Sequence, residues 1–551
     1  MTQAQQQPAS PTAAQNQEAR ARCDRGIELH RQGKTGEAAA EYAAAIALDP
    51  ELAAPYINLG LLAQKSELPD KALALYAQAF ALQPDNPPLL AEMVLLAQKA
   101  CIWDKTDALE ALLLDMVRRK REGIVPFTIL GTAATAADQL LAAQTFCRAI
   151  APPEKDLFRH DKRRASVENG SKKIKIGYLS SDYRSHATAH LMAELFERHD
   201  RARFHIAAYS YGQNAEDAMR QRLVAAFDDF TEVRHLDDRA AAQKIYDDDV
   251  DILVDLKGGF TPGARIGIAA FRPAPVQVNF LGYPGTMGAD FIDYIIADRF
   301  IIPESHEKFY SEKTVCLPNS YQPNDTRRQI ATPTPSRADC GLPEGAFVFC
   351  CLSAAYKITP DVFAIWMNLL EKAPGSVLWL FESIPSVKNS ILQAAQSRGI
   401  GAERIVFAPR AAPAQHLARQ KCADLFLDTL PVNAHTTASD ALWAGLPVLT
   451  RAGETFAGRV AGSLLSAAGF PELIAKTPEE YESVALRLAR NPAQCAALRE
   501  KIEKTRAQMP LFDIARYAKN LESAYQTMWT AWRAKEQPRA FTVAEERPPA
   551  S

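Results

Sequence analysis

Residues able to bind an anion stand at the start of a predicted helix in the stretch "LDTLPVNAHTTASDALWAGLPVLT", residues 427–450. A strand pattern leads into His435, Thr436 and Thr437, and the helix that follows ends at Gly445. Backbone N–H groups are free at a helix start, where the macrodipole places about half a positive charge. The hydroxyls and the imidazole add donors, so the stretch predicts a binding site for an anion, above all a phosphate. The alternative is a threonine N-cap beside an incidental histidine.

Two other predicted strands lead into residues with related chemistry. His186 and His190 follow "KIKIGYLSS", and Lys357 follows "FVFCCLS" at the corresponding point of a second series of strands. An ammonium group at that point could face a phosphate as a point charge. A solvated loop histidine and an ordinary surface lysine are the alternatives.

Helical spacing brings further polar residues together. "FAPRAAPAQHLARQ" places His416 and Arg419 three residues apart on one predicted face. Asp440 shares a face with Thr436, four residues before it, and its carboxylate could hold a ribose hydroxyl. The Gly/Pro turn "LGYPGTMG", residues 281–288, either lines a site or simply reverses the chain.

Short apolar strands alternating with helical stretches must position these residues. The first series is "KIKIGYLSSD", "FHIAAYSY", "DILVDLKGGF", "PVQVNFLGYPG" and "YIIADRFI"; the second is "FVFCCLS", "SVLWLFES", "RIVFAP", "DLFLDTL" and "PVLT". This pattern predicts an α/β fold of two doubly wound units with largely parallel sheets. A proline-rich segment, residues 317–345, is predicted to link them. A ligand would lie in the cleft between the units, at the carboxyl ends of the strands.

A repeat precedes the strands. The small and aromatic residues of "EYAAAIALDP" recur 34 residues later in "LYAQAFALQP", and Gly26 recurs as Gly60. That period, with a closing proline, predicts tetratricopeptide helix pairs. We therefore expect a disordered N-terminus over 1–17, repeats with a helical cap over 18–152, α/β units over 153–330 and 331–510, and a C-terminal helix and tail over 511–551.

Composition excludes several classes of protein. At 551 residues the chain is too long for one core, and a formal net charge of −2 gives no field that would attract nucleic acid. No run reaches 18 apolar residues and the N-terminus is too polar for a signal peptide, so we expect no membrane partner. Nine cysteines without C-x-x-C spacing predict reduced thiols in a cytoplasmic protein.

Several long motifs resemble one family. They are "IGYLSSDYRSHATAHL", "RPAPVQVNFLGYPGTMGADFIDYIIAD", "LPVNAHTTASDALWAGLPVLTRAGETFAGRVAGSLL" and "ELIAKTPEEY". With the repeats, the chain from about residue 20 to 535 resembles the bacterial relatives of the protein O-linked N-acetylglucosamine transferase, glycosyltransferase family 41. The resemblance implies a GT-B fold of two Rossmann-like units, a UDP-sugar donor, and inverting transfer of N-acetylglucosamine to Ser or Thr of a protein that the repeats bind. It implies no essential metal and no cofactor apart from the UDP-sugar co-substrate.

The resemblance implies that the second α/β unit binds the nucleotide. His435, Thr436 and Thr437 match the family's pyrophosphate-binding helix start, and Lys357 matches its phosphate-binding lysine. Around the nucleoside, the matching residues are His416 against the uracil, Arg419 and Ala411 beside it, and Asp440 on the ribose.

The first α/β unit supplies the residues that match the sugar and acceptor side. His186 matches a histidine whose proposed role as the base is disputed, and His190 stands beside it. Gly282 and Pro284 match a turn that lines the sugar pocket. An upstream histidine implicated in catalysis has no clear counterpart, since the nearby His160 lies outside any motif.

The chain departs from the O-GlcNAc enzymes at several of these positions. Ala354 stands in place of a glutamine, Pro413 in place of a lysine near the ribose, and Val432 in place of a cysteine beside the sugar. Phe260 and Pro262 replace a tyrosine and a lysine. These changes leave open a UDP-glucose donor, an asparagine acceptor, another nucleotide-sugar enzyme such as an epimerase, and a repeat-based binding protein whose catalytic units have decayed.

One pattern suggests a metal. "DDDVD" contains Asp249-x-Asp251, which resembles the metal–nucleotide motif of another class of glycosyltransferase. Because these carboxylates precede the strand "ILVDL", we expect them in a solvated turn at the amino edge of the sheet, away from the cleft. No His/Cys/Glu spacing elsewhere suggests a metal, and none is expected.

Overall fold

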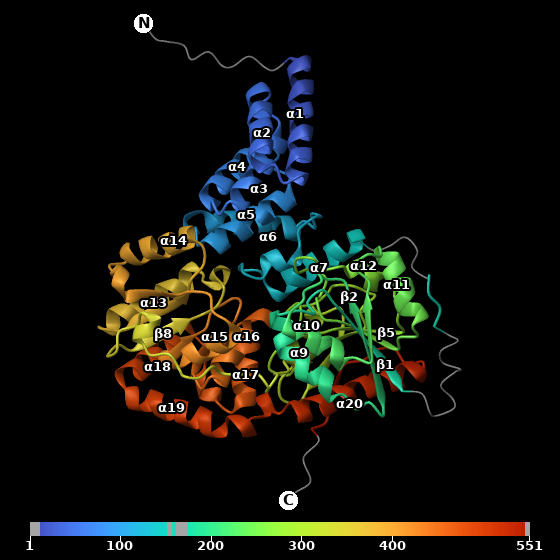
Figure 1. Cartoon of the computed structure of the whole chain (residues 1–551), viewed down its shortest axis with the longest axis vertical. Helices are drawn as coiled ribbons and strands as arrows, with labels where there is room; N and C mark the ends of the chain where they lie inside the picture. Colours follow the sequence, from blue (N-terminus) through green and yellow to red (C-terminus); the bar gives the residue numbers. More distant parts are fainter. Residues whose placement is uncertain (1–11, 151–156, 161–172, 546–551) are drawn as a thin grey trace, which may run out of the picture. The chain divides into compact units, whose positions relative to one another are not determined.

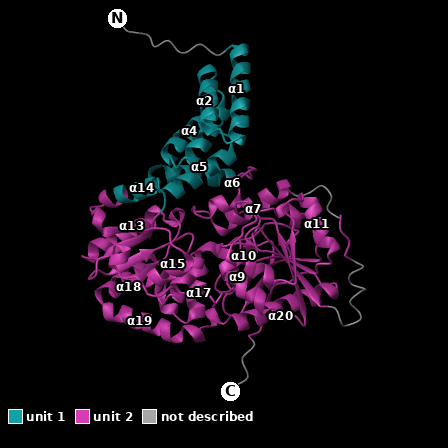
Figure 2. Ribbon diagram, viewed as in Figure 1, with its two compact units in different colours: residues 1–116, 383–393 teal, residues 117–382, 394–551 magenta. Residues whose placement is uncertain are grey.

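The computed structural model describes residues 12–150, 157–160 and 173–545. Contacts divide the chain into two compact units, residues 1–116 with 383–393 and residues 117–382 with 394–551 (Figure 2). The predicted disordered start lies outside the described residues as far as residue 11, but the chain is helical from Ala13. No helix in the described ranges is long and apolar enough to cross a membrane.

Helix pairs form the first unit. Its helices are α1 (Ala13–Arg31), α2 (Thr35–Leu48), α3 (Ala53–Lys65), α4 (Pro69–Leu82), α5 (Pro87–Ala100) and α6 (Thr106–Arg118), which begins there (Figure 1). A Cβ on Gly26 would lie 2.5 Å from the Tyr42 ring, and a Cβ on Gly60 would lie 2.3 Å from the Tyr76 ring. The same glycine–tyrosine contact therefore closes both pairs, which explains why these residues recur with the repeat.

A parallel sheet of eight strands forms the first α/β part of the second unit. In spatial order the strands are β14 (Phe541–Thr542), β7 (Lys313–Leu317), β6 (Tyr294–Asp298), β5 (Val276–Asn279), β4 (Ile252–Asp255), β1 (Ile174–Ser180), β2 (Phe204–Ser210) and β3 (Asp229–Glu232). The five predicted strands correspond to β1, β2, β4, β5 and β6, which are neighbours in the middle of the sheet. The strands β3, β7 and β14 were not predicted. Because β14 pairs with β7, the C-terminal tail forms the edge of the sheet.

Helices cover both faces of this sheet, because successive residues of a strand point to opposite sides. Leu179 belongs to the apolar cluster that contains α11 (Asp238–Asp247) and α12 (Ile266–Ala270). Its neighbour Tyr178 contacts the ring of Phe196 on α9 (Ala187–Arg198) and the hydroxyl of Tyr525 on α20 (Ile514–Arg533). The predicted C-terminal helix thus packs on the first sheet, while Pro510–Phe512 just before it contacts α17 of the second α/β part.

A parallel sheet of six strands forms the second α/β part. Its strands, in spatial order, are β10 (Ile405–Ala408), β9 (Val377–Phe381), β8 (Val348–Cys351), β11 (Leu425–Leu427), β12 (Val448–Arg451) and β13 (Ile474–Ala475). The helices are α13 (Pro360–Lys372), α15 (Pro413–Arg419), α16 (Thr436–Trp443), α17 (Val460–Ala468), α18 (Pro478–Arg490) and α19 (Pro492–Thr505). Most of α14 (Pro385–Gln396) is grouped by its contacts with the first unit. All five predicted strands are confirmed, and two Rossmann-like sheets in one chain are the predicted GT-B architecture.

The helix α7 (Ala136–Ile150) belongs with the α/β part of the chain. Cys147 donates its thiol to the Met287 carbonyl oxygen at 3.0 Å, and a Cβ on Gly288 would lie 2.4 Å from the backbone nitrogen of Gln144. Contacts therefore place the division of the chain near residue 116, whereas the sequence placed the end of the helical cap at 152.

The segment between the two sheets is not a solvated tether. Residues 320–325 are buried, and the Asn324 side chain contacts the Leu511 carbonyl oxygen at 3.2 Å and the Ser439 hydroxyl on α16. Its prolines and low apolar content predicted a linker correctly, but its polar side chains find buried partners on both α/β parts. We call residues 318–330 the connecting segment.

Candidate active site

A cavity of about 730 Å³ lies at the carboxyl ends of strands from both sheets, a volume typical of a ligand site. Leu352 follows β8 and Phe381 ends β9. The helices α15 and α16 supply one wall, and α9, α10 (Ala218–Ala226) and the connecting segment supply the other. Six of the predicted site residues line it: His190, Ala411, His416, Thr436, Thr437 and Asp440. The cavity lies where the sequence placed the cleft.

The start of α16 is an open helix end. The N-cap residue His435 makes no capping hydrogen bond with its side chain, and Thr436 and Thr437 of the first turn line the cavity. Instead, His435 Nε2 contacts the Ala457 carbonyl oxygen at 3.1 Å, which requires the proton on Nε2. Burial and the nearby Lys357 charge lower the pKa of His435 to about 3, so the ring is neutral. The imidazole N–H is therefore already hydrogen-bonded within the protein. The donors that remain for a ligand are the backbone N–H groups and the threonine hydroxyls.

Lys357 reaches the same helix start from β8. Its Nζ donates to the Asn433 carbonyl oxygen at 2.6 Å, two residues before the N-cap. Burial lowers the pKa of Lys357 to about 8, which the nearby Asp428 carboxylate partly offsets. Lys357 does not line the cavity wall, so its predicted contact with a phosphate stays a prediction.

His416 and Arg419 contact each other, as their spacing predicts. Arg419 Nη2 donates to His416 Nδ1 at 2.7 Å, and Arg419 Nη1 donates to the Pro409 carbonyl oxygen. Burial, and then the Arg419 charge, lower the pKa of His416. A neutral ring is thus held in the cavity wall, whereas Arg419 is buried and acts on the cavity through His416.

Asp440 has a partner that the sequence analysis missed. Arg328, from the connecting segment, forms an ion pair with Asp440 inside the cavity. Arg222 and Arg327 also line this wall, and both pair with carboxylates: Arg222 with Asp325, and Arg327 with Glu197. The sequence contains a signal for this partner, the charged run "NDTRRQ" in a segment otherwise poor in charge. The prediction of a linker assigned no function to these residues.

A second, more open cavity of about 840 Å³ adjoins the first at His190, Arg410 and Ala411 and contains His186. His186 is the N-cap of α9: its Nδ1 accepts the Thr188 backbone N–H at 3.2 Å. Burial lowers the pKa of His186, so the ring is neutral and its proton resides on Nε2. In this tautomer Nε2 can donate a hydrogen bond but cannot accept a proton.

A buried ion pair holds the base of this site. Lys257 Nζ, beyond β4, donates to Asp182 Oδ2 beyond β1 at 2.8 Å, and Asp182 Oδ2 is 3.5 Å from His186 Nδ1. Neither residue was singled out from the sequence. The other histidine of this strand tip, His190, has a pKa that burial and the Arg328 charge both lower.

Gly282 and Pro284 line neither cavity. Their turn is anchored by the buried Glu312, which accepts the Met287 backbone N–H at 2.7 Å and the Thr286 hydroxyl at 2.6 Å. A Cβ on Gly282 would lie 2.1 Å from the Leu256 carbonyl oxygen, so close approach of two chains requires this glycine. The structure supports the chain-reversal reading, and a contact with the sugar stays a prediction.

The departures from the family pattern lie in different parts of the structure. Ala354 and Pro413 line the first cavity, where they offer no polar side chain. Val432 and Phe260 are buried in one apolar cluster with Tyr283, so their apolar character suits their neighbours. The remaining two lie elsewhere: Pro262 is exposed, and His160 Nε2 contacts the Arg272 carbonyl oxygen at 3.0 Å, before β5.

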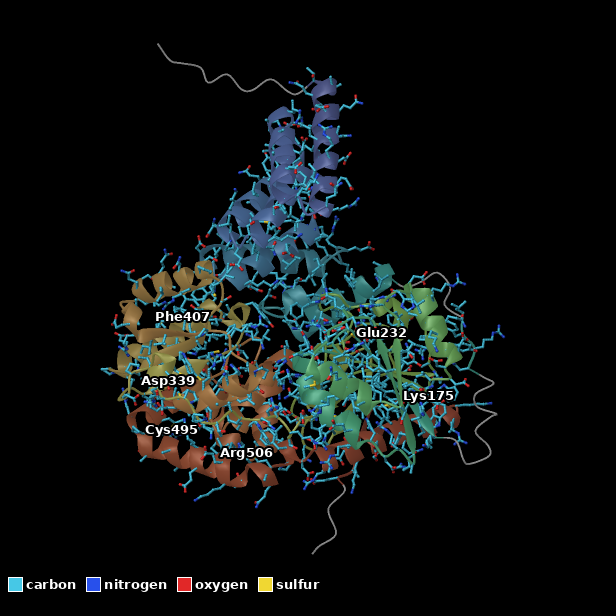
Figure 3. The ribbon with its side chains drawn as sticks, in the orientation of Figure 1. Lys175, Glu232, Asp339, Phe407, Cys495 and Arg506 are labelled. Carbon is cyan, nitrogen blue, oxygen red and sulfur yellow. The ribbon has the colours of Figure 1, made fainter. Side chains whose placement is uncertain are left out.

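Asp249 and Asp251 lie at the amino edge of the first sheet, as predicted. Asp251 is not solvated, however: it is buried, and its Oδ2 accepts the backbone N–H of Lys175, labelled in Figure 3, at 2.9 Å. Among the residues that the structure describes, no group of three or more His, Cys, Asp or Glu side chains could hold a metal ion.

Comparisons with known proteins agree with this architecture. The model of glycosyl transferase family 41 matches residues 143–332 and 323–521, and that of the TPR repeat matches residues 26–66. A solved structure of a mutant O-GlcNAc transferase from Thermobaculum terrenum has a TM-score of 0.76 and 26% identity, and the match covers 95% of this chain and 99% of that chain.

Two curated relatives are longer than this chain. The probable UDP-N-acetylglucosamine–peptide N-acetylglucosaminyltransferase SEC of Arabidopsis thaliana is 38% identical over 69% of this chain and 39% of its own. The UDP-N-acetylglucosamine–peptide N-acetylglucosaminyltransferase of Caenorhabditis elegans is 30% identical over 67% of this chain and 42% of its own. The chain thus spans about two fifths of their length. Since the family model covers more than half of the residues, in both α/β parts, the chain belongs to glycosyl transferase family 41.

Proposed function

We propose that this protein transfers N-acetylglucosamine from its UDP-sugar to Ser or Thr side chains of protein acceptors. The observation that carries the proposal is the first cavity, of about 730 Å³, where an open helix end, a carboxylate and a neutral histidine ring line one wall. These are groups suited to a diphosphate, a ribose and a base, respectively. The curated relatives are named for the same transfer.

The nucleotide would lie against the second α/β part. His416 would stack on the uracil, with Arg419 and Ala411 beside it, and Asp440 would accept the ribose hydroxyls. The first turn of α16 would donate N–H and hydroxyl groups to the diphosphate, and Lys357 would add a positive charge. Because the charge that develops during transfer is on the departing diphosphate, preorganised donors at this point would lower the barrier.

The acceptor would enter from the second, more open cavity, which contains His186. Its hydroxyl oxygen would attack the anomeric carbon on the face opposite the diphosphate, UDP would leave with the bonding electrons, and the configuration would invert. The hydroxyl proton would pass to water or to a phosphate oxygen of the donor. The neutral His186 tautomer supports a role as a hydrogen-bond donor through Nε2, not as the base. His190 would lie between the two substrates, since it lines both cavities.

Two further parts of the proposal concern partners. The helix pairs of the first unit would bind an extended segment of the acceptor protein, as stacked repeats commonly do. No divalent cation would be required, because Lys357 and the start of α16 would neutralise the diphosphate. We expect activity in the cytoplasm, where nucleotide sugars and reduced thiols coexist.

Titration with nucleotides tests the donor. UDP, UDP-N-acetylglucosamine and UDP-glucose should be compared by thermal shift, because a ligand that binds only the folded protein raises its melting temperature. We expect stabilisation by UDP and a preference for UDP-N-acetylglucosamine over UDP-glucose. No stabilisation by any of the three would contradict the proposal, and a preference for UDP-glucose would change the donor.

Mass spectrometry tests the transfer. Proteins co-expressed with this chain should carry an N-acetylhexosamine increment on Ser or Thr that is absent when Lys357 is replaced by Ala. A hexose increment, or a modified asparagine, would indicate the other donor or acceptor. No increment, together with intact UDP binding, would indicate a binding protein that has lost its catalytic activity.

A further inference from the structure

We propose that Arg328 binds the ribose of the nucleotide together with Asp440, so that the connecting segment is part of the donor site. This inference rests on the proposed function, since it assigns a further residue to the same site. Arg328 lines the first cavity, yet only 9% of its side chain is exposed. A guanidinium that is nearly buried and faces a cavity is held in a fixed position, unlike a solvated surface arginine.

The hydrogen bonds of the guanidinium leave one of its three nitrogens, Nη2, for a ligand. Arg328 Nε donates to the Asp325 carbonyl oxygen at 3.2 Å, and Nη1 pairs with Asp440 Oδ1. Nη2 is buried and has no hydrogen-bond partner among the described residues. A buried donor without a partner is unfavourable, so a ligand atom that accepts a hydrogen bond from it binds more tightly.

The backbone holds this side chain in position. Trp443 Nε1, on α16, donates to the Arg328 carbonyl oxygen at 3.2 Å, and the same helix carries Asp440. Ala354 and Pro413, on the facing wall, carry no donor. Arg328 is therefore placed to supply a polar contact that these two residues do not.

The neighbouring carboxylate selects the ligand atom. A ribose hydroxyl has one proton to donate and an oxygen that accepts. It could donate to Asp440 and accept from Arg328 Nη2 at the same time, so that the ion pair recognises the hydroxyl through both groups. A uracil offers no such hydroxyl, and the diphosphate is assigned to the start of α16.

Nucleotides that lack one hydroxyl test this contact. The affinities of UDP, 2′-deoxy-UDP and 3′-deoxy-UDP should be measured by calorimetry for the wild-type protein and for the variants Arg328→Met, Arg328→Lys and Arg327→Met. We expect Arg328→Met to weaken UDP binding about tenfold, the scale of one hydrogen bond to a charged group. The analogue that lacks the contacted hydroxyl should bind the full chain and Arg328→Met with similar affinity. Arg328→Lys should fall between, because an ammonium keeps the charge without the fork.

Arg327→Met is the matched control. It removes the adjacent positive charge of the same segment, but the Arg327 side chain is 56% exposed and pairs with Glu197. Since Arg327 also lines the cavity, loss of its charge should act on all three nucleotides equally, so the ratio of UDP to deoxy-UDP affinity should stay at its wild-type value. Thermal melts without ligand would check that each variant is folded.

Three results would overturn the inference or its basis. Unchanged UDP affinity in Arg328→Met, or an equal loss for all three nucleotides, would show that Arg328 only braces the connecting segment against α16. A wild-type chain that binds none of the nucleotides would contradict the proposed function itself. The wild-type titration therefore separates the two failures.

Discussion

The two α/β parts each place a helix start near the candidate site, but they use it differently. In the first part the N-cap His186 accepts the Thr188 backbone N–H with its own side chain, so α9 begins with a closed end. In the second part the N-cap His435 makes no such bond and turns its ring to Ala457, so α16 begins with an open end. Both positions carry a histidine, yet only the second leaves the first-turn N–H groups to an anion.

This difference separates the two substrates. An open helix end beside a lysine suits the diphosphate, whose charge grows as the glycosidic bond breaks. A closed end with an outward Nε2–H suits a neutral hydroxyl. The identity of the N-cap residue does not reveal this; the partner of each ring does.

Replacing Lys357 by Ala should produce the largest effect. If Lys357 stabilises the departing diphosphate, turnover with a protein acceptor should fall by roughly 10²–10³, the scale for one preorganised donor at a developing anion. Donor affinity should fall less, because the open end of α16 still holds the ground-state phosphates. Steady-state and single-turnover rates, with a thermal melt as a folding check, would measure both quantities. Full turnover in this variant would remove the lysine from the phosphate site.

Asp440→Asn provides the opposite pattern as a control. The ribose hydroxyls do not change charge during transfer, so this change should weaken donor binding more than turnover of bound donor. If both variants lost donor affinity and turnover in the same proportion, Asp440 and Lys357 would not have the separate roles assigned to them at the ribose and the diphosphate.

Much of the fold could be predicted from strand periodicity. The central strands were recognised because runs such as "ILVD" and "VFCC" are buried on both faces of a parallel sheet. The polar edge strand β3 and the two-residue β14 were missed, because edge strands bury too little to need an apolar pattern.

The site was predicted only where its residues follow strands. His416, Thr436 and Asp440 lie after strands of one sheet, and the carboxyl-end rule places them together. Arg328 lies in no repeating pattern, because its position depends on where the connecting segment crosses α16. A long-range approach of this kind leaves no trace in local spacing.

A pH series would sharpen the comparison of the two helix ends. Burial lowers the pKa of Lys357 to about 8, so its positive charge is present below that pH and is lost above it. Affinity for UDP-N-acetylglucosamine, whose diphosphate stays fully ionised, should therefore fall about tenfold between pH 7 and pH 9. Calorimetry would show this fall, and Lys357→Ala should abolish it. A constant wild-type affinity over this range would mean that the charge of Lys357 does not interact with the diphosphate of the donor.

Variants of His186 should produce a smaller effect, on stability. Removing the N-cap acceptor by His186→Ala should lower the free energy of unfolding by about 1 kcal/mol, while His186→Asn keeps an N-cap acceptor and should lose less. If the ring also donates to the acceptor hydroxyl, turnover should fall in both variants. Denaturant titrations and rate measurements on the same samples would separate the two roles. Equal stability of the Ala and Asn variants would argue against a closed end of α9.

Removal of divalent cations should have the smallest effect, which is none. An open helix end and a lysine at the diphosphate would supply the charge that a bound cation supplies in other nucleotide-sugar enzymes. The acidic pair that resembles a metal motif lies on the other edge of the sheet, where Asp251 accepts the Lys175 backbone N–H. Transfer rates in excess EDTA, magnesium and manganese should therefore agree, and Asp249→Asn should leave them unchanged. A strict requirement for manganese would break the comparison at its centre, because the start of α16 would then not be sufficient to hold the diphosphate.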